Sequence, residues 1–338
     1  MSTLPPIGGV GRYVAGLLRG LVEAGGAGLE VVPLVPPRRR NTSFWVLFEL
    51  QARTRRGFDL VHFPFYYPPL APRCPVTVAV HDVLLFEHPD WFPRAWGTWM
   101  RFLIARGLRE AAAVVTGSQS AAAAIAGLGL AAGDRVRVIP YGVDRTVFMP
   151  PTAERIRLTL RRFGLDCPYV IQFGGLEPRR GLDLSVTAVR EARSTFTDLE
   201  LVLVGSVRTV TPGLDRLPPW VRRLEAVADT EAPALLAGAK AVLAPSRGEG
   251  FDLPVLEALA CGAAVIASDI PVHRELFGGA IAEFANGVAE DLARVLLEVL
   301  TRSDWRDRLR AGGPEFAARF TWAATARGHV ELWSRILL

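Results

Sequence analysis

The chain has 338 residues, of which 50% are hydrophobic and 22% are charged. This length favours two domains, and the composition excludes an intrinsically disordered chain. The formal net charge of +5 favours anionic partners in general, without choosing among nucleotide phosphates, nucleic acids and membrane surfaces.

The three cysteines, Cys74, Cys167 and Cys261, are far apart in the sequence, which fits neither a disulfide framework nor a zinc motif. No apolar run approaches the ~20 residues that span a bilayer, and no secretory signal opens the sequence. We therefore expect a cytoplasmic protein, either soluble or peripheral at the inner face of the membrane.

The first half of the chain alternates short apolar segments with longer amphipathic ones. Residues 8–14 are expected to be a loop that opens the first helix. No convincing strand precedes this loop, so we expect the first strand of the domain to be missing because of a truncated or misassigned start. Strands are expected at residues 29–35, 60–63, 76–80, 113–116 and 136–139. Helices are expected at residues 91–108 and 118–126.

The second half repeats this alternation after an aperiodic segment at residues 142–151. Strands are expected at residues 169–173, 200–204, 221–226, 240–243 and 264–267. Near-continuous apolar strands between helices are typical of parallel sheets covered on both faces. We therefore expect an α/β chain with an N-terminal domain at residues 1–148 and a C-terminal domain at residues 149–320. A last helix, within residues 321–338, is expected to pack back on the first domain.

The most informative motif is PSRGEGFDLPVLEA at residues 245–258, which follows an expected strand and opens a helix. Backbone N–H groups at a helix start attract anions such as a sugar diphosphate. Glu249 lies in the loop and Glu257 lies about one turn into the helix, so both can face one crevice at the carboxyl ends of the strands. Carboxylates accept two hydrogen bonds from a vicinal diol, which suits sugar hydroxyls. The alternative is that Glu257 only caps or solvates the helix.

A second motif, FGGLEPRRG at residues 173–181, also connects a strand to a helix. Gly174 and Gly175 would let the backbone approach a phosphate, and Arg180 can bind phosphate oxygens through its planar fork. The alternative is a solvated arginine pair, which we favour for Arg179.

Two further segments carry polar groups at element ends in the first half. The segment GGVGRY at residues 8–13 places Gly9 before a helix, and His81 and Asp82 end an expected strand. Either feature is also common for purely structural reasons. Ser118 follows another expected strand, and its role is open.

These motifs together resemble the retaining glycosyltransferases of family 4, which adopt the GT-B fold. The likeness centres on EGFDLPVLEALACGAAVIASD and includes VIPYGVD at residues 138–144 and FTW at residues 320–322. It implies two Rossmann-like domains that face a cleft, and donor contacts from Glu249 to the sugar and from Glu257 to the ribose. It further implies that Arg180 stands where a lysine usually binds the donor diphosphate.

The resemblance also implies that His81 binds near the donor sugar and the reacting centre, with Asp82 orienting its loop. The residues expected to act in catalysis are His81, Arg180 and Glu249. The residues expected to bind the donor are Gly9, Gly174, Gly175, Arg180, Glu249, Gly250, Phe251, Asp252, Leu253 and Glu257.

Two positions depart from the family pattern. Asp252 replaces the usual glycine of EGFGLP, which is expected to alter sugar preference or to crowd the phosphate. Gly175 stands where some members carry an arginine, so neutralisation of the diphosphate is expected to depend more heavily on Arg180.

The resemblance implies transfer of a hexose, with retention, from GDP-mannose or UDP-glucose to a hydroxyl of a polysaccharide or lipid-linked precursor. The sequence contains no Asp-x-Asp and no Cys/His cluster, so we expect no metal and no cofactor beyond the nucleotide sugar as co-substrate. The alternative is a GT-B subunit that binds nucleotide sugar without turning it over. A dehydrogenase is disfavoured because Gly9 and Gly11 lack the third small residue of the dinucleotide fingerprint. Nucleic-acid binding is disfavoured because the basic residues are dispersed.

A basic, aromatic-rich segment at residues 38–56 is compatible with peripheral membrane contact. Its apolar residues occupy nearly every side of a helix, however, so we favour burial for this segment.

Overall fold

The computed structural model describes residues 8–24, 28–34, 57–66, 73–174, 177–205, 216–225 and 227–338. The chain forms two compact units, one of residues 1–142 with 321–338 and one of residues 143–320. The basic segment at residues 38–56 and the expected phosphate-binding Gly175 lie outside the described residues.

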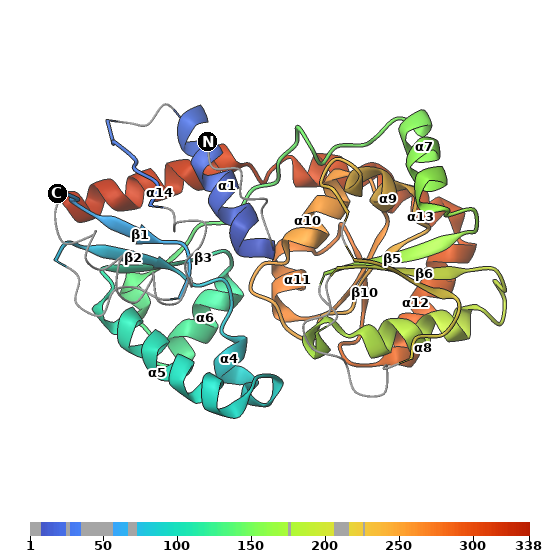
Figure 1. The fold of residues 1–338 in the computed structure, drawn as a ribbon, viewed down its shortest axis with the longest axis horizontal. Coiled ribbons are helices and arrows are strands. Elements are labelled where there is room, and N and C mark those ends of the chain that lie inside the picture. Colours follow the sequence, from blue (N-terminus) through green and yellow to red (C-terminus); the bar gives the residue numbers. More distant parts are fainter. Residues whose placement is uncertain are drawn as a thin grey trace. The chain divides into compact units, whose positions relative to one another are not determined.

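The first unit is built on a parallel sheet whose described strands have the order β1-β2-β3-β4 (Figure 1). The strands are β1 (Val61–Phe63), β2 (Val76–Ala79), β3 (Ala113–Thr116) and β4 (Val136–Val138). Buried side chains of β2 and β3 pack with those of the following helices in one apolar core. The strands expected between residues 60 and 139 are therefore confirmed.

The described helices of this unit are α1 (Gly8–Glu23), α4 (Leu84–Glu87), η2 (Pro89–Trp91), α5 (Arg94–Glu110), α6 (Gln119–Gly127), η3 (Gly133–Arg135) and α14 (Trp322–Leu337). Helix α14 runs beside α1 although the two helices lie near opposite ends of the sequence, as Figure 1 shows. A Cβ at Gly16 would lie 2.0 Å from the Trp322 ring, and one at Gly20 would lie 2.1 Å from the Trp322 carbonyl oxygen. Glycine at both positions therefore permits this helix contact.

Two expectations for the first unit are wrong. Residues 8–14 form the first turns of α1 and not a loop, because tertiary packing against α14 outweighs the low helix propensity of glycine. Residues 29–34 are not a strand, because no described strand pairs with them and Val31 and Val32 are 42% and 49% exposed. The missing first strand concerns residues 1–7, which lie outside the described residues.

The second unit contains a parallel sheet with the described order β10-β9-β8-β5-β6-β7. The strands are β5 (Tyr169–Phe173), β6 (Glu200–Val204), β7 (Val221–Leu224), β8 (Val242–Ala244), β9 (Val265–Ser268) and β10 (Ala282–Phe284). The chain proceeds from β5 to one edge and then returns to β8 on the other side of β5. This reversal creates a topological switch point between β5 and β8, where open α/β sheets bind ligands at the carboxyl ends of their strands.

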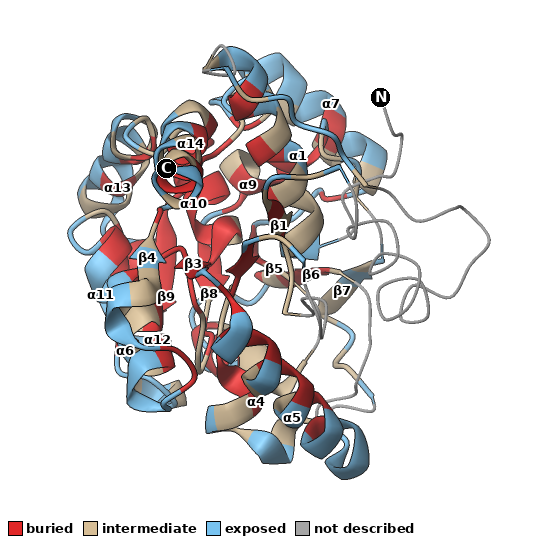
Figure 2. Ribbon diagram, turned by 90° about the vertical axis from the view of Figure 1, so that its left-hand side faces the viewer, coloured by how far each residue is buried: buried red, intermediate tan, exposed pale blue. Residues whose placement is uncertain are grey.

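The described helices of this unit are α7 (Ala153–Phe163), η4 (Pro178–Arg180), α8 (Leu182–Ala192), α9 (Ala232–Gly238), α10 (Leu253–Ala260), α11 (Pro271–Phe277), α12 (Ala289–Thr301) and α13 (Ser303–Ala317). Helices α8 and α12 lie on one face of the sheet, and α9 and α10 lie on the other (Figure 1). Figure 2 shows strands β8 and β9 as buried, in keeping with a sheet covered on both faces. The five strands expected in this half are confirmed, with shifts of one or two residues at their ends, and the short edge strand β10 was not expected.

Candidate functional site

The two motifs of the second half lie side by side at the switch point. The first loop, residues 174–181, follows β5, and the second loop, residues 245–252, follows β8. Because neighbouring parallel strands end at the same edge of a sheet, the two loops share one site. The first loop leads into α8 and the second into α10, with Pro254 at the second position of that helix.

Backbone and side-chain contacts hold the two loops together. Gly181 has φ +63°, and a Cβ there would lie 2.1 Å from the Pro245 carbonyl oxygen. The Arg247 backbone N–H donates to the Arg179 carbonyl at 2.8 Å. The Arg247 guanidinium binds both carboxylate oxygens of Asp183, at 3.0 and 2.6 Å, and the Pro178 carbonyl at 2.8 Å. Arg247 therefore positions the loops, a role that sequence reasoning missed.

Glu249 is the centre of a charged cluster between the loops. Arg180 Nη1 lies 2.7 Å from Glu249 Oε1, and Arg179 Nη1 donates to both Glu249 oxygens at 3.1 Å. Arg179 Nε also donates to Glu177 at 2.7 Å. The Glu249 side chain is only 7% exposed. The interpretation of Arg179 as a solvated residue is thus wrong, since two carboxylates hold it at the site.

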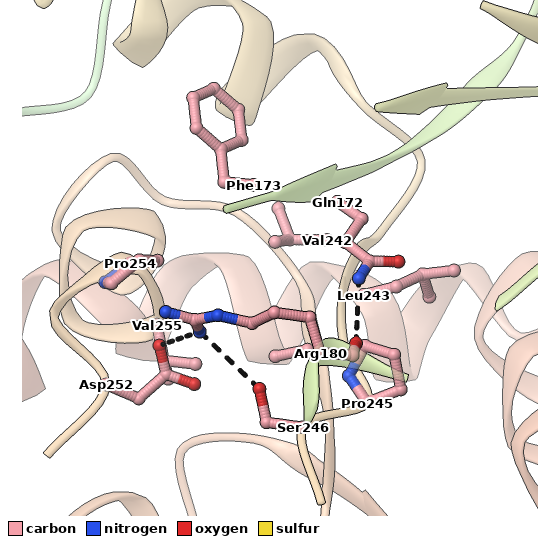
Figure 3. A pocket seen from close by; sticks show the side chains of 11 residues that line it. Gln172, Phe173, Arg180, Val242, Leu243, Pro245, Ser246, Asp252, Pro254 and Val255 are labelled. Atoms are coloured by element: carbon pink, nitrogen blue, oxygen red, sulfur yellow. Dashed lines mark hydrogen bonds and ion pairs between the residues drawn. The ribbon is translucent and has the colours of Figure 1, made fainter. Parts of the chain in front are cut away.

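Arg180 is the more deeply placed arginine, with its side chain 13% exposed. Its Nη1 also lies 3.4 Å from Asp252 Oδ1 and 3.5 Å from Ser246 Oγ, and its carbonyl accepts from Gln172 Nε2 at 2.8 Å (Figure 3). A Cβ at Gly174, where φ is +124°, would lie 3.2 Å from Arg180 Nε. Glycine at 174 therefore gives this side chain its space.

A small cavity of about 10 Å³ lies beside Arg180, between β5, β8 and the start of α10 (Figure 3). That volume holds about one water molecule at most. Two buried polar atoms that line it, Arg180 Nε and Gln172 Oε1, have no hydrogen-bond partner within the described part of the chain. The cavity is therefore too small to hold a phosphate group.

Asp252, the residue that departs from the family pattern, has φ +67°, in the left-handed region that favours glycine. Its carboxylate is buried and uses both oxygens: Oδ1 faces Arg180 and Oδ2 lies 3.0 Å from His273 Nε2. Burial raises the pKa of Asp252, but the His273 hydrogen bond and the Arg180 charge outweigh it and lower the pKa overall. The Asp252 side chain thus points into the protein and joins the charged cluster around Glu249.

The other expected donor-binding residues near α10 are largely buried. Glu257 is 7% exposed and lies one turn into the helix. The Phe251 ring packs edge-on against Phe277 and Phe320, with centroids 6.2 and 6.1 Å apart. The Phe251 and Leu253 side chains are therefore core residues, and their backbone N–H groups are what they can offer a ligand.

Gly9 and His81, the remaining candidates, lie in the first unit. Gly9 is exposed in the first turn of α1. The His81 ring uses both nitrogens: Nε2 donates to the Pro64 carbonyl at 2.9 Å, and Nδ1 lies 2.8 Å from the Tyr141 hydroxyl. Burial lowers the pKa of His81, so its ring is neutral at pH 7 with the proton on Nε2.

Asp82 and Ser118 form local hydrogen bonds in the first unit. Asp82 Oδ1 accepts from the Leu84 N–H at 3.1 Å and thereby fixes the loop that follows His81. Ser118 is the N-cap of α6, and its Oγ accepts from the Ala121 N–H at 3.1 Å.

A buried network of histidines that includes Tyr13 of α1 was not predicted from the sequence. The Tyr13 hydroxyl lies 2.9 Å from His62 Nε2 and 2.8 Å from His329 Nε2. His62 Nδ1 lies 2.9 Å from the Thr77 hydroxyl, which also accepts from the Trp333 indole at 3.2 Å. These residues come from α1, the sheet and α14, so the network links segments that are far apart in the sequence.

Among the described residues, no group of three or more His, Cys, Asp or Glu side chains is arranged to hold a metal ion. In the same residues, no helix has the length and apolarity needed to cross a membrane.

Comparisons with known proteins agree with these motifs. The family model described as Glycosyltransferase Family 4 matches residues 7–147, and the one described as Glycosyl transferases group 1 matches residues 167–302. O-antigen chain mannosyltransferase B of Escherichia coli is 26% identical over 314 residues, which cover 87% of this chain and 76% of the relative.

A D-inositol 3-phosphate glycosyltransferase of Stackebrandtia nassauensis is 34% identical over 245 residues, 64% of this chain, and the match spans only 52% of that relative. The solved structure of Anabaena HepE in complex with UDP and glucose has a TM-score of 0.73 and 18% identity, and the match covers 99% of this chain and 98% of that chain. At this identity the structural likeness establishes the fold, two parallel-sheet units of the GT-B type. The chain belongs to family 4 of the glycosyltransferases.

Proposed function

We propose that this glycosyltransferase moves a hexose from a nucleotide sugar, of the GDP-mannose or UDP-glucose type, to a hydroxyl of a polysaccharide or glycolipid precursor. The mannosyltransferase relative and the UDP and glucose bound to HepE support this range of donors. The observation that carries the proposal is the Arg180–Glu249 pair, with side chains 13% and 7% exposed, at the switch point next to the start of α10. This arrangement places a cation and the positive end of a helix dipole where a diphosphate can bind.

The proposed mechanism begins with an exchange of partners at Arg180. A donor phosphate oxygen replaces Glu249 on the guanidinium, and the released Glu249 accepts hydrogen bonds from the sugar, while Glu257 binds the ribose. The bond between the anomeric carbon and the phosphate oxygen then breaks. Arg180 and the positive end of the α10 dipole stabilise the negative charge that develops on the departing diphosphate.

The acceptor oxygen bonds to the anomeric carbon on the face that the diphosphate leaves, which retains the configuration. Its proton passes to a phosphate oxygen of the departing diphosphate, so no protein base and no metal ion is required. A role of His81 near the donor sugar, which the resemblance implies, requires the Tyr141 hydroxyl or the Pro64 carbonyl to give up its hydrogen bond with the neutral ring.

Turnover with each donor, followed by NMR of the anomeric proton of the product, tests this proposal. We expect the same anomeric configuration in donor and product, activity that survives EDTA, and a loss of about 10²-fold or more in Arg180→Ala. Arg190→Ala is the matched control, since this exposed arginine of α8 donates to Thr187 on its own helix. An inverted product would refute the retaining mechanism. Donor binding without any product would instead support the non-catalytic subunit.

We also propose that α5 brings the protein to an anionic membrane surface. Trp96, Trp99 and Phe102 follow one another at intervals of three residues and are 47%, 58% and 60% exposed. The Trp99 and Phe102 rings stack with centroids 6.0 Å apart. Figure 2 shows exposed segments alternating with buried ones along this helix, whose other side packs into the core.

Charge favours a lipid surface as the partner of α5. The helix carries four arginines, at positions 94, 101, 106 and 109, and Glu110 is its only acidic residue. Aromatic rings beside arginines on one helix face suit the interface of an anionic bilayer. We expect Trp99→Ala/Phe102→Ala to abolish flotation with vesicles that contain phosphatidylglycerol, while the control Leu158→Ala, which removes an exposed apolar side chain of α7, floats like the unmodified protein. Equal flotation of all three proteins would refute this contact.

A further inference from the structure

Residue 252 is an aspartate, although its backbone conformation favours glycine. Its left-handed conformation is the one that glycine adopts without strain, yet this chain has an aspartate there. Both carboxylate oxygens are engaged inside the protein, one toward Arg180 and one toward His273. A side chain that is buried, charged and held on both sides at a strained position points to a role at the site.

We propose that Asp252 and His273 form a positioning pair for Arg180, in which Asp252 holds the guanidinium and His273 neutralises Asp252, so that the charge of Arg180 stays available to the donor diphosphate. This inference rests on the proposed function of Arg180 as the ligand of the diphosphate. It assigns a role to His273, which lies 21 residues after Asp252 in the sequence.

The hydrogen bonds of His273 define its protonation state. Nδ1 lies 2.8 Å from the Ser268 carbonyl, which can only accept, so Nδ1 carries a proton. Nε2 lies 3.0 Å from Asp252 Oδ2, which also only accepts when Asp252 is ionised. His273 is therefore an imidazolium beside an ionised Asp252. Burial lowers the pKa of His273, but the hydrogen bond and charge of Asp252 outweigh it and raise the pKa overall.

The ends of two strands are hydrogen-bonded to each other beside this imidazolium. The Ser268 hydroxyl, at the end of β9, donates to the Ser246 carbonyl in the loop after β8 at 2.5 Å. The charged groups that face His273 are Asp252 and, farther away, Glu249. On its own helix, Arg274 is exposed and pairs with Asp269 at 3.5 Å. The Phe277 ring packs against the imidazole with centroids 6.1 Å apart and brings no charge.

The charges of the loop cluster balance only when His273 is protonated. The cluster consists of Glu177, Arg179, Arg180, Glu249, Asp252 and His273. Loss of the imidazolium charge leaves one uncompensated carboxylate beside the arginine that receives the diphosphate. The extra negative charge repels an anionic donor, and Asp252 then competes with the donor for Arg180.

Three variants separate this role from a structural one. His273→Gln keeps an N–H toward Asp252 but removes the positive charge, and we expect the Kd of UDP-glucose or GDP-mannose to rise by about tenfold. Asp252→Gly removes the negative charge and the hold on Arg180 together. We expect its Kd to stay within about threefold of the unmodified value, while its kcat falls by about tenfold because the guanidinium is less well positioned.

The double variant Asp252→Gly/His273→Gln is the decisive one. Because the carboxylate that needs compensation is absent, its Kd should match that of Asp252→Gly and lie below that of His273→Gln. The Kd of the unmodified protein should also rise with pH once His273 deprotonates, and this dependence should be absent from the double variant. Thermal unfolding of all the variants shows that each is folded under the binding conditions.

A Kd of His273→Gln equal to that of the unmodified protein overturns the inference, as does a double variant weaker than both single variants. Arg180→Ala keeps this result separate from the proposed function. If Arg180→Ala loses donor binding while His273→Gln does not, only the positioning pair is refuted. If Arg180→Ala binds the donor normally, the proposed function fails and the pair fails with it.

Discussion

Gly181→Ala should damage the site far more than its backbone conformation alone requires. A Cβ at Gly181 would lie 2.1 Å from the Pro245 carbonyl oxygen, about 1 Å closer than real Cβ contacts allow, so the two loops must separate. The left-handed φ of +63° adds about 1–2 kcal/mol for any residue with a Cβ, and overpacking adds about 1–3 kcal/mol. We therefore expect a loss of stability of about 2–5 kcal/mol.

Gly164→Ala is the matched control, because Gly164 has nearly the same φ of +61° but open surroundings. A Cβ there would meet only the Arg222 Nη2 atom, at 3.5 Å, at the C-terminus of α7. The control should lose about 1–2 kcal/mol and keep its activity.

Urea denaturation measures the stability of both glycine variants, and a transferase assay measures kcat. Since Arg180 adjoins Gly181, a displacement of about 1 Å should lower kcat in Gly181→Ala by up to about 10²-fold. Equal stability and equal kcat in the two variants would refute the view that the approach of the loops builds the site.

Three further predictions concern single side chains. Glu257→Ala should weaken donor binding by about ten- to hundredfold without unfolding the protein, since a carboxylate hydrogen-bonded to ribose is worth about 1.5–3 kcal/mol; an unfolded variant would show that Glu257 serves the helix alone. Burial lowers the pKa of His329 to about 4 and that of His62 also below its usual range, so the unfolded chain takes up protons first as the pH falls below about 6.5. The stability that neutral His62 and His329 contribute is therefore complete above pH ~6.5, and the His329 part should fall by about 2 kcal/mol at pH 5; equal urea midpoints at pH 7 and pH 5 would contradict this. Ser118→Ala should cost about 1 kcal/mol in the same assay through loss of the N-cap of α6, and no change would show that the cap contributes little.

Much of the fold follows from local pattern. Strands β5, β6, β8 and β9 of the second unit are largely buried, so they are nearly continuous runs of apolar residues that end within two residues of the predicted positions. Strand β10 was missed because it has three residues at a sheet edge, with one side chain exposed. Residues 29–34 show the same pattern as a strand but have no described pairing partner, and local pattern carries no information about pairing.

The site was only partly predictable, because local pattern does not reveal which loops meet in the fold. Gly174, Arg180 and Glu249 lie in two motifs that end neighbouring strands, and the structure brings them together. The binding of Arg179 by two carboxylates and the pairing of His273 with Asp252 depend on how separate loops meet. Only a chain-specific departure, aspartate in place of glycine at 252, signalled that an unusual contact was present.

The most direct test of the account is calorimetric titration of the purified protein with UDP-glucose and with GDP-mannose, in the absence of Mg²⁺. We predict saturable binding of one donor by the unmodified protein and by Arg190→Ala, and loss of that binding in Arg180→Ala. A folded protein that binds neither donor, or an Arg180→Ala variant that binds as tightly as the unmodified protein, would contradict the proposed donor site.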